Sequence, residues 1–324
     1  MKALVYTGVE TLEYRDAPDP VPGDSEVIVR IDSVGICGSD MHGYLGHDDR
    51  RPAPLILGHE GAGTVVGGPM NGQRVTINPL VTNPQSAASR AGRENICPDR
   101  QIISMPPREG AFADAIAMPT RNLVPVPDHV SFEAAAMTEP MAVSWHAVDL
   151  GLAALHPAME RRAIVIGGGA IGVAALLCLR AMGCADVTLI EPNDARRDYL
   201  TQTQAMHAVA QTDQPAPLIV DAVGLSATRA LASAMVEPGG VIVHIGLGDD
   251  AGGLDIRRMT LQEITFIGTY TYTAQNFRDC AQAIFDGRLG SLDWVELRPL
   301  AEGAQAFADI RAGTVPAPKI ILKP

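Results

Sequence analysis

The sequence predicts a two-domain protein of the α/β class, in which an antiparallel, barrel-like β domain precedes a doubly wound parallel sheet covered by helices. Three observations support this prediction. The chain has 324 residues, of which 47% are hydrophobic, and this is enough for two packed cores. In its first third, short runs of alternating apolar residues are separated by proline- and glycine-rich turns. After Ser131, continuous apolar runs alternate with helical patterns, which is typical of a parallel sheet buried on both faces.

The β domain is expected to contain short strands in the first eighty residues or so. Turn-forming segments such as APDPVPGD at 17–24 separate them. The predicted strands are KALVYTG (2–8), TLEYRDAP (11–18), SEVIVRIDSVGIC (25–37), GHEGAGTVVGG (58–68) and GQRVTI (72–77).

The second domain is expected to begin after a helical pattern over 131–152. Strands are predicted at 162–170, 186–192, 216–224 and 239–248, with helices at 171–183 and 193–206. The tail predicts helices at 274–290 and 302–313, then a last strand, PKIILKP (318–324), that returns to the β domain. The domain bounds we expect are 1–143, completed by 276–324, and 144–275.

Charge and composition limit the possible partners. The chain has 25 Lys and Arg against 37 Asp and Glu, a formal net charge of −12, and no basic run, so nucleic acid and anionic membranes are not expected partners. No apolar run approaches the roughly 18–20 residues that span a bilayer, and the N-terminus lacks the features of a signal peptide. Its five cysteines are odd in number and scattered, which favours a reducing cytoplasm.

A glycine pattern in the second domain predicts a dinucleotide site. Gly167, Gly169 and Gly172 form G-x-G-x-x-G after a predicted strand and at the start of a helix. Gly167 would permit a tight turn, Gly169 would let the backbone approach a pyrophosphate, and Gly172 would allow close packing of the helix. Further candidate cofactor contacts are Ala170, Ile171, Val223 and Gly246.

Glu191 ends the next predicted strand, about twenty residues after the glycines, where an acid binds the ribose hydroxyls of NAD. Its charge would repel the 2′-phosphate of NADP, so we predict NAD. Alternatively, Glu191 caps the helix that follows. Arg196 and Arg197 argue in the opposite direction, because an arginine there could stack on adenine or bind a phosphate.

The β domain holds residues that can bind a metal. Cys37 and His59 are ligands that zinc prefers, and the carboxylates of Asp40, Glu60 and Glu139 can coordinate a metal or support its ligands. Each also has a simpler interpretation: Cys37 as a core residue, His59 as a turn residue, and Glu139 as an acid favoured at a helix N-terminus.

The motifs GICGSDMH (35–42), GHEGAG (58–63), Glu-Pro at 139–140 and GGGAIG (167–172) occur in one order. With them the whole chain resembles the zinc-dependent medium-chain alcohol dehydrogenase family, in its polyol branch of sorbitol, idonate and galactitol-phosphate dehydrogenases. The resemblance implies a GroES-like β-barrel domain, a Rossmann domain and one catalytic zinc in the cleft between them. Cys37 and His59 would be zinc ligands, with Asp40 orienting His59. Either Glu139 or Glu60 would be the third ligand, the other glutamate holding a water and helping as general base.

The resemblance also implies the reaction: hydride transfer from a secondary alcohol, of polyol or sugar-acid type, to NAD, giving the ketone. Ser39 would take the alcohol proton and His42 would pass it outward. Alternatively, Ser39 is a turn residue and His42 a partly exposed polar residue. Tyr44, His47, Arg50 and Arg51 are possible substrate contacts, although we expect both arginines to be solvated loop residues.

Many members of the family carry a second, structural zinc bound by four cysteines. Cys97 matches the fourth, but Asn83, Ser86 and Ser89 stand at the other positions, so we predict no structural zinc. A homo-oligomer, dimer or tetramer, is expected on family grounds. Two competing functions are a zinc-free NADPH-dependent reductase of quinones or enones and a non-catalytic nucleotide-binding protein.

Overall fold

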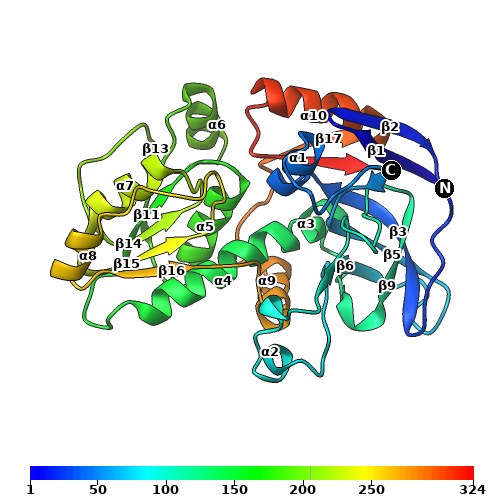
Figure 1. Ribbon diagram of the computed structural model, residues 1–324, viewed down its shortest axis with the longest axis horizontal. Coiled ribbons are helices and arrows are strands. Elements are labelled where there is room, and N and C mark those ends of the chain that lie inside the picture. Colours follow the sequence, from blue (N-terminus) through cyan, green and yellow to red (C-terminus); the bar gives the residue numbers. More distant parts are fainter. Residues whose placement is uncertain (205) are drawn as a thin grey trace. The chain divides into compact units, whose positions relative to one another are not determined.

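The computed structural model describes residues 1–204 and 206–324 (Figure 1). These residues form two compact units: unit 1 comprises Met1–Glu139, Thr273–Gly287 and Val295–Pro324, and unit 2 comprises Pro140–Tyr272 and Arg288–Trp294. The expected bounds placed all of 276–324 in the β domain, whereas Arg288–Trp294 belongs to unit 2. There the guanidinium of Arg288 lies over the ring of Trp145, 5.7 Å from its centroid.

Unit 1 is built on a seven-stranded sheet with the order β10-β6-β5-β3-β18-β17, and β9 pairs with β3. The last strand, β18, pairs antiparallel with β3, which confirms that the tail returns to the β domain. However, β17 pairs with β18 in parallel, so the sheet is mixed rather than purely antiparallel. The strands are β3 (Glu26–Gly35), β5 (Glu60–Val66), β6 (Arg74–Ile77), β9 (Ala115–Pro119), β10 (Leu123–Pro125), β17 (Val295–Pro299) and β18 (Lys319–Lys323).

Two smaller sheets complete unit 1. One has the order β2-β1-β4 and the other pairs β7 with β8. Helix α10 packs beside β2 (Figure 1). The elements are β1 (Lys2–Gly8), β2 (Thr11–Asp16), β4 (Leu55–Ile56), β7 (Leu80–Val81), β8 (Gln101–Ile102), α1 (Gly38–Tyr44), α2 (Ala87–Arg90), α3 (Phe132–Ala136), α9 (Ala274–Phe285) and α10 (Gly303–Ala312), with 3-10 turns η1 (Glu94–Ile96), η2 (Thr120–Asn122) and η3 (Leu300–Glu302).

The helical pattern over 131–152 forms two helices rather than one. Helix α3 is capped by Ser131, whose hydroxyl accepts a hydrogen bond from Ala134, and it ends at Ala136. Helix α4 (Thr138–Ala154) then begins, with Pro140 in its first turn. Proline is tolerated there because the first backbone N–H groups of a helix have no partner within it. Among the described residues, no helix combines the length and the apolar character needed to cross a bilayer.

Unit 2 is a parallel six-stranded sheet with the order β13-β12-β11-β14-β15-β16. All residues of β14 are buried, and Ile164, Ile219 and Ile242 form part of the core. Its elements are β11 (Arg162–Ile166), β12 (Asp186–Ile190), β13 (Ala208–Val209), β14 (Ala216–Asp221), β15 (Val236–His244), β16 (Thr265–Gly268), α5 (Ala170–Ala181), α6 (Asp194–Gln204), α7 (Ser226–Met235) and α8 (Ile256–Leu261). The helix predicted over 193–206 includes Ala205, which lies outside the described residues.

The strand order of unit 2 confirms the doubly wound sheet. The chain moves outward from β11 through β12 to β13 and then returns to β14 on the other side of β11. Such a reversal leaves a crevice at the carboxyl ends of the two central strands, where nucleotides bind in folds of this kind. The turn after β11 contains the predicted glycine pattern.

Candidate metal centre and nucleotide-binding turn

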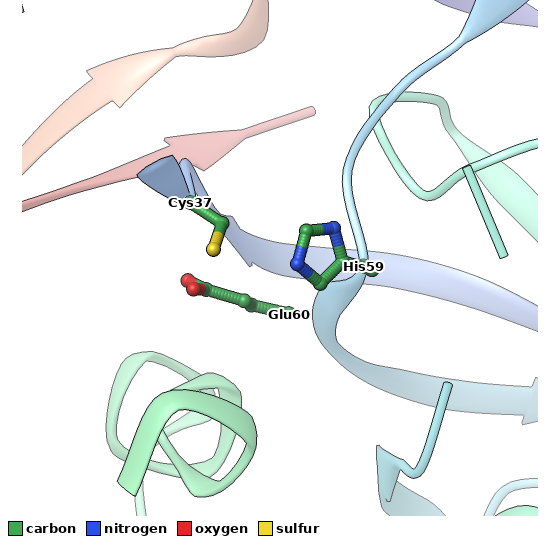
Figure 2. A group of neighbouring side chains, drawn as sticks. All are labelled: Cys37, His59 and Glu60. Carbon is green, nitrogen blue, oxygen red and sulfur yellow. The ribbon is translucent and has the colours of Figure 1, made fainter. Parts of the chain in front are cut away.

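Three of the predicted ligands come together in unit 1. The ligand atoms of Cys37, His59 and Glu60 all lie within 4.8 Å of one another, and the side chains point toward a common centre (Figure 2). Cys37 precedes α1, whereas Glu60 is the first residue of β5 and His59 immediately precedes that strand. A thiolate sulfur, an imidazole nitrogen and a carboxylate oxygen form a donor set that fits zinc.

Asp40 links two of these residues. Its Oδ2 accepts a hydrogen bond from the backbone N–H of Cys37 (3.0 Å), and its Oδ1 accepts one from the N–H of Gly58 (3.1 Å). The same Oδ1 lies 3.3 Å from Nδ1 of His59. Burial opposes ionisation of Asp40, but His59, Arg51 and the N–H of Cys37 lower its pKa below the ordinary value. An ionised Asp40 therefore fixes the His59 ring and the backbone of Cys37.

A buried lysine holds the third residue of the cluster. Nζ of Lys319, at the start of β18, donates to Oε1 (2.7 Å) and Oε2 (2.8 Å) of Glu60 and to the carbonyl of Ile36 (2.8 Å). Burial alone would lower the pKa of Lys319, but the charges of Glu60, Cys37 and Glu139 raise it. Lys319 is not among the residues predicted from the sequence, where its only signal is a lysine at the start of an apolar strand.

Gly35 makes space for the Glu60 carboxylate. The two residues pair directly between β3 and β5. A Cβ atom at residue 35 would lie 2.0 Å from Oε2 of Glu60, which is far closer than such atoms can approach. The position of the carboxylate therefore requires glycine on the neighbouring strand.

Glu139, the other candidate for third ligand, is buried in the first turn of α4. The charge of Glu139 contributes to the raised pKa of Lys319, the lysine that also holds Glu60. Among the described residues, however, the group with metal-binding geometry contains Glu60 and not Glu139.

The residues expected near the substrate differ in exposure. Oγ of Ser39 lies 3.3 Å from Nε2 of His59, whereas His42 is exposed, with its ring centroid 6.4 Å from that of His47. Tyr44 is buried against Phe307, with ring centroids 5.2 Å apart, so it is a core residue rather than a free polar contact.

The two arginines of this segment are also unlike each other. The Arg50 side chain is 62% exposed, as expected for a solvated loop residue, but that of Arg51 is only 1% exposed. The expectation that Arg51 is solvated is therefore wrong. The reason is local packing, since Arg51 lies over a glycine of α1.

The lobe at 82–100 surrounds a buried thiol with hydrogen bonds. Cys97 is buried, and hydrogen bonds from the Ser86 hydroxyl and from the N–H groups of Asn83 and Asp99 lower its pKa. The N–H of Ser89 donates to Ser86 Oγ (3.0 Å). The four positions that match the family's structural zinc site are therefore close together and linked by hydrogen bonds.

The glycine turn has the geometry that its three predicted roles need. Gly167 has φ = +101°, which favours glycine. A Cβ atom at Gly172 would lie 1.7 Å from the carbonyl oxygen of Gly167, so only glycine lets α5 pack against the turn. A Cβ atom at Gly169, the N-cap residue of α5, would meet no described atom within 4 Å. Ala170 and Ile171 form the first turn of this helix, whose N–H groups suit a phosphate.

Glu191 supports the glycine turn through hydrogen bonds of its carboxylate. Its Oε2 accepts a hydrogen bond from the N–H of Gly168 (3.0 Å), and its Oε1 accepts one from the N–H of Asn193 (2.8 Å). The residue that caps α6 is Asn193, whose Oδ1 accepts from the N–H of Arg196 (2.9 Å). The alternative that Glu191 itself caps this helix is therefore wrong. Arg197 donates to the carbonyl of Glu191 (3.0 Å).

The two other cofactor candidates lie at the carboxyl ends of β14 and β15. A Cβ atom at Gly246 would lie 2.1 Å from the carbonyl carbon of Val223, so the two backbones are in close contact. Asp221 fixes this contact, because its Oδ1 accepts hydrogen bonds from the N–H groups of Val223 (3.1 Å) and Gly224 (2.9 Å). In the sheet order β14 is next to β11, which the glycine turn follows, and β15 is one strand further away.

Comparison with known proteins identifies both parts of the chain. Residues 23–128 match the alcohol dehydrogenase GroES-like domain, and residues 170–286 match the zinc-binding dehydrogenase domain. The chain is 32% identical to a D-xylulose reductase of Morganella morganii over 95% of each sequence. It is 28% identical to the L-galactonate-5-dehydrogenase of Escherichia coli K12, over 89% of this chain and 88% of that protein.

The fold also matches solved structures. Galactitol-1-phosphate dehydrogenase from Escherichia coli superposes with a TM-score of 0.88 at 23% identity, and the match covers 100% of both chains. At this level of identity the likeness shows that the two chains share a fold. The chain belongs to the zinc-dependent medium-chain alcohol dehydrogenase family, in its polyol dehydrogenase branch.

Proposed function

We propose that the protein is a zinc- and NAD-dependent dehydrogenase that oxidises a secondary alcohol of a polyol or sugar acid to the ketone. The observation that carries the proposal is the cluster of Cys37, His59 and Glu60 in a chain that also has the nucleotide-binding turn. The names of the relatives, D-xylulose reductase and L-galactonate-5-dehydrogenase, support the substrate class.

Cys37, His59 and Glu60 would hold the metal, with Asp40 orienting His59 and Lys319 holding Glu60. Bound zinc supplies a Lewis acid that lowers the pKa of the alcohol, and bound NAD supplies the hydride acceptor. The buried charges of Asp40 and Lys319 keep the donor atoms in place before any ligand arrives.

The contact between Ser39 Oγ and His59 Nε2 supports Ser39 as the first acceptor of the alcohol proton. His42 is three residues further along α1, so it lies on the same side of the helix, and its exposure suits a group that passes the proton to solvent.

Replacing Ser39 with alanine is expected to lower kcat by about 10²–10⁴, the usual contribution of a positioned proton acceptor. The Kd of NADH should change less than about threefold, because the glycine turn belongs to unit 2. Steady-state kinetics and fluorescence titration with NADH measure the two quantities. Equal losses in both would exclude Ser39 from proton transfer.

Replacing Glu191 with glutamine is expected to reduce the preference for NAD over NADP at least tenfold. The amide oxygen can still accept one of the two backbone hydrogen bonds that the carboxylate accepts, but the charge that repels a 2′-phosphate is lost. The ratio of kcat/KM for the two cofactors measures the effect. An unchanged ratio would show that another group discriminates between them.

Zinc analysis combined with NAD reduction across polyols and sugar acids tests the proposal. We expect about one zinc per chain and oxidation of at least one secondary alcohol, both lost after chelation. Activity with NADPH and an enone in the absence of zinc would instead support the reductase. NADH binding without turnover of any substrate would support a non-catalytic protein.

The proposal has two further parts. We infer a homo-oligomer, dimer or tetramer, from the family resemblance, and a cytoplasmic location from the scattered cysteines. Light scattering of the purified protein and fractionation of cells test these parts.

A further inference from the structure

We propose that Arg51 binds an anionic group of the substrate, a carboxylate or a phosphate, so that the alcohol oxidised is a sugar acid or sugar phosphate rather than a neutral polyol. This inference rests on the proposed function, because it specifies the charge of the molecule that the same site oxidises. It depends on the burial, contacts and position of a single guanidinium group.

The chain makes a specific place for this side chain. Arg51 is almost completely buried although it lies in the segment that joins α1 to β4. Its stem passes over Gly43 of α1, where a Cβ atom would lie 2.8 Å from Cδ of Arg51. A solvated arginine can lay its stem along the surface but keeps its charged head in water, whereas the guanidinium of Arg51 is buried with its stem.

The contacts of Arg51 leave one edge of the guanidinium with few hydrogen-bond partners. Nη1 is paired with Asp48, which also binds Arg50 (2.8 Å), so Arg51 has no carboxylate of its own. Nη2 makes only a long contact, 3.4 Å, to Oγ of Ser39. The buried Nε has no hydrogen-bond partner in the described part of the chain.

These two donors, Nε and Nη2, lie on one edge of the planar group, which is the edge that binds carboxylates and phosphates through two parallel hydrogen bonds. A buried N–H without a partner costs about 1–3 kcal/mol, so a site that keeps one gains when a ligand supplies the acceptor. The geometry therefore favours a planar or tetrahedral oxyanion over a neutral hydroxyl group.

The position of the guanidinium relative to the metal ligands suits a substrate contact. Ser39 Oγ lies 3.4 Å from Nη2 of Arg51 and 3.3 Å from Nε2 of His59, so one hydroxyl group connects the two. The charge of Arg51 also lowers the pKa of Asp40. An oxyanion on Arg51 and an alcohol at the cluster would thus belong to one small molecule.

The alternative is that Arg51 only fastens the segment to α1 through Asp48 and Ser39. The two roles make different predictions. A fastening residue would affect stability and all substrates equally, whereas an anion-binding residue affects anionic substrates most. Arg50 provides a matched control, because it binds the same Asp48 but is largely exposed.

The experiment compares the zinc-loaded wild type with Arg51→Gln, Arg51→Lys and Arg50→Gln. Substrates are sorbitol and xylitol, gluconate and galactonate, and sorbitol 6-phosphate. We expect the wild type to prefer an anionic substrate in kcat/KM by at least tenfold. Arg51→Gln should lower kcat/KM for it by roughly 30- to 4,000-fold, the range for truncating one partner of a buried charge pair, mainly through KM. The loss for neutral polyols should be at least tenfold smaller.

Arg51→Lys should recover only part of the loss, because it restores the charge without the two parallel donors. Arg50→Gln should change every substrate by less than threefold. A preference for aldonates identifies a carboxylate, and a preference for sorbitol 6-phosphate identifies a phosphate; either supports the inference.

A wild type that prefers neutral polyols would overturn the inference, as would equal losses on all substrates together with a lower Tm in Arg51→Gln. If no alcohol is oxidised, the proposed function fails and calorimetry decides the inference separately. Gluconate or sorbitol 6-phosphate that binds the zinc-loaded wild type but not Arg51→Gln supports an anion site, and equal binding to both overturns it.

Discussion

Replacing Cys37 with alanine is expected to remove zinc from the protein and to lower alcohol-dependent NAD reduction by at least about a thousandfold. The sulfur is one of three donors within 4.8 Å, and the other two cannot close a zinc site alone. Loss of Lewis-acid assistance, worth several kcal/mol, accounts for the size of the effect, since each 1.36 kcal/mol is a factor of about ten. Elemental analysis and steady-state kinetics measure the two losses.

Cys97→Ser is the matched control for this variant. Cys97 lies in the lobe, among Asn83, Ser86 and Ser89, which offer no thiolates. Zinc content should therefore remain near one per chain in Cys97→Ser and near zero in Cys37→Ala. A wild type with two zinc atoms, of which Cys97→Ser loses one, would contradict this expectation and assign a metal to the lobe.

Binding of NADH to Cys37→Ala should be preserved. The glycine turn, Glu191 and the ends of β14 and β15 all belong to unit 2, which does not contain Cys37. Fluorescence titration with NADH gives its Kd. A Kd raised as strongly as turnover is reduced would indicate that the variant is misfolded, and Cys37→Ser would then serve as the milder replacement.

Features with a local cause could be predicted from the sequence. Strand β3 alternates buried and more exposed residues over Glu26–Ile31, and this alternation can be read from the sequence. The turn after β11 needs glycines for its conformation and for close contact, and these glycines form a pattern within a few neighbouring residues. Cys37 and His59 were identified because their residue types are uncommon and chemically specific.

Features set by distant parts of the chain could not be predicted. Lys319 meets Glu60 across 259 positions of sequence, and nothing near either residue indicates the other. The choice between Glu60 and Glu139 likewise depends on where two residues from distant segments of the chain lie in space. The burial of Arg51 depends on Gly43, which has no Cβ atom to block the arginine stem. Nothing in the sequence connects the two residues.

Replacing Lys319 with methionine is expected to destabilise the zinc-free protein by about 3–5 kcal/mol, because it leaves the buried charge of Glu60 without its partner. At about 2.1 cal/mol/K of unfolding entropy per residue, this loss lowers the Tm of a chain of 324 residues by roughly 4–7 °C. Thermal unfolding followed by circular dichroism measures it. The double variant Lys319→Met/Glu60→Gln should recover much of the loss, since a neutral amide is less costly to bury than a carboxylate.

Lys323→Met is the matched control for the lysine substitution. Lys323 ends the same strand, β18, and pairs with Asp32 (2.6 Å), but its side chain remains partly exposed. Ion pairs in contact with solvent contribute little to stability, about 0–1 kcal/mol. The Tm of Lys323→Met should therefore fall much less than that of Lys319→Met. Equal losses in Tm in the two variants would show that the ion pair of Lys319 and Glu60 stabilises the fold no more than a partly exposed one.

The response of Lys319→Met to zinc distinguishes the two candidates for the third ligand. A ligand that binds only the folded protein raises its Tm in proportion to the binding free energy. If Glu60 contacts zinc, the metal neutralises the charge that Lys319 no longer pairs, and zinc should raise the Tm of Lys319→Met more than that of the wild type. Adding Glu60→Gln should remove this extra stabilisation, whereas adding Glu139→Gln should leave it. The reverse result would make Glu139 the ligand and confine Glu60 to its ion pair.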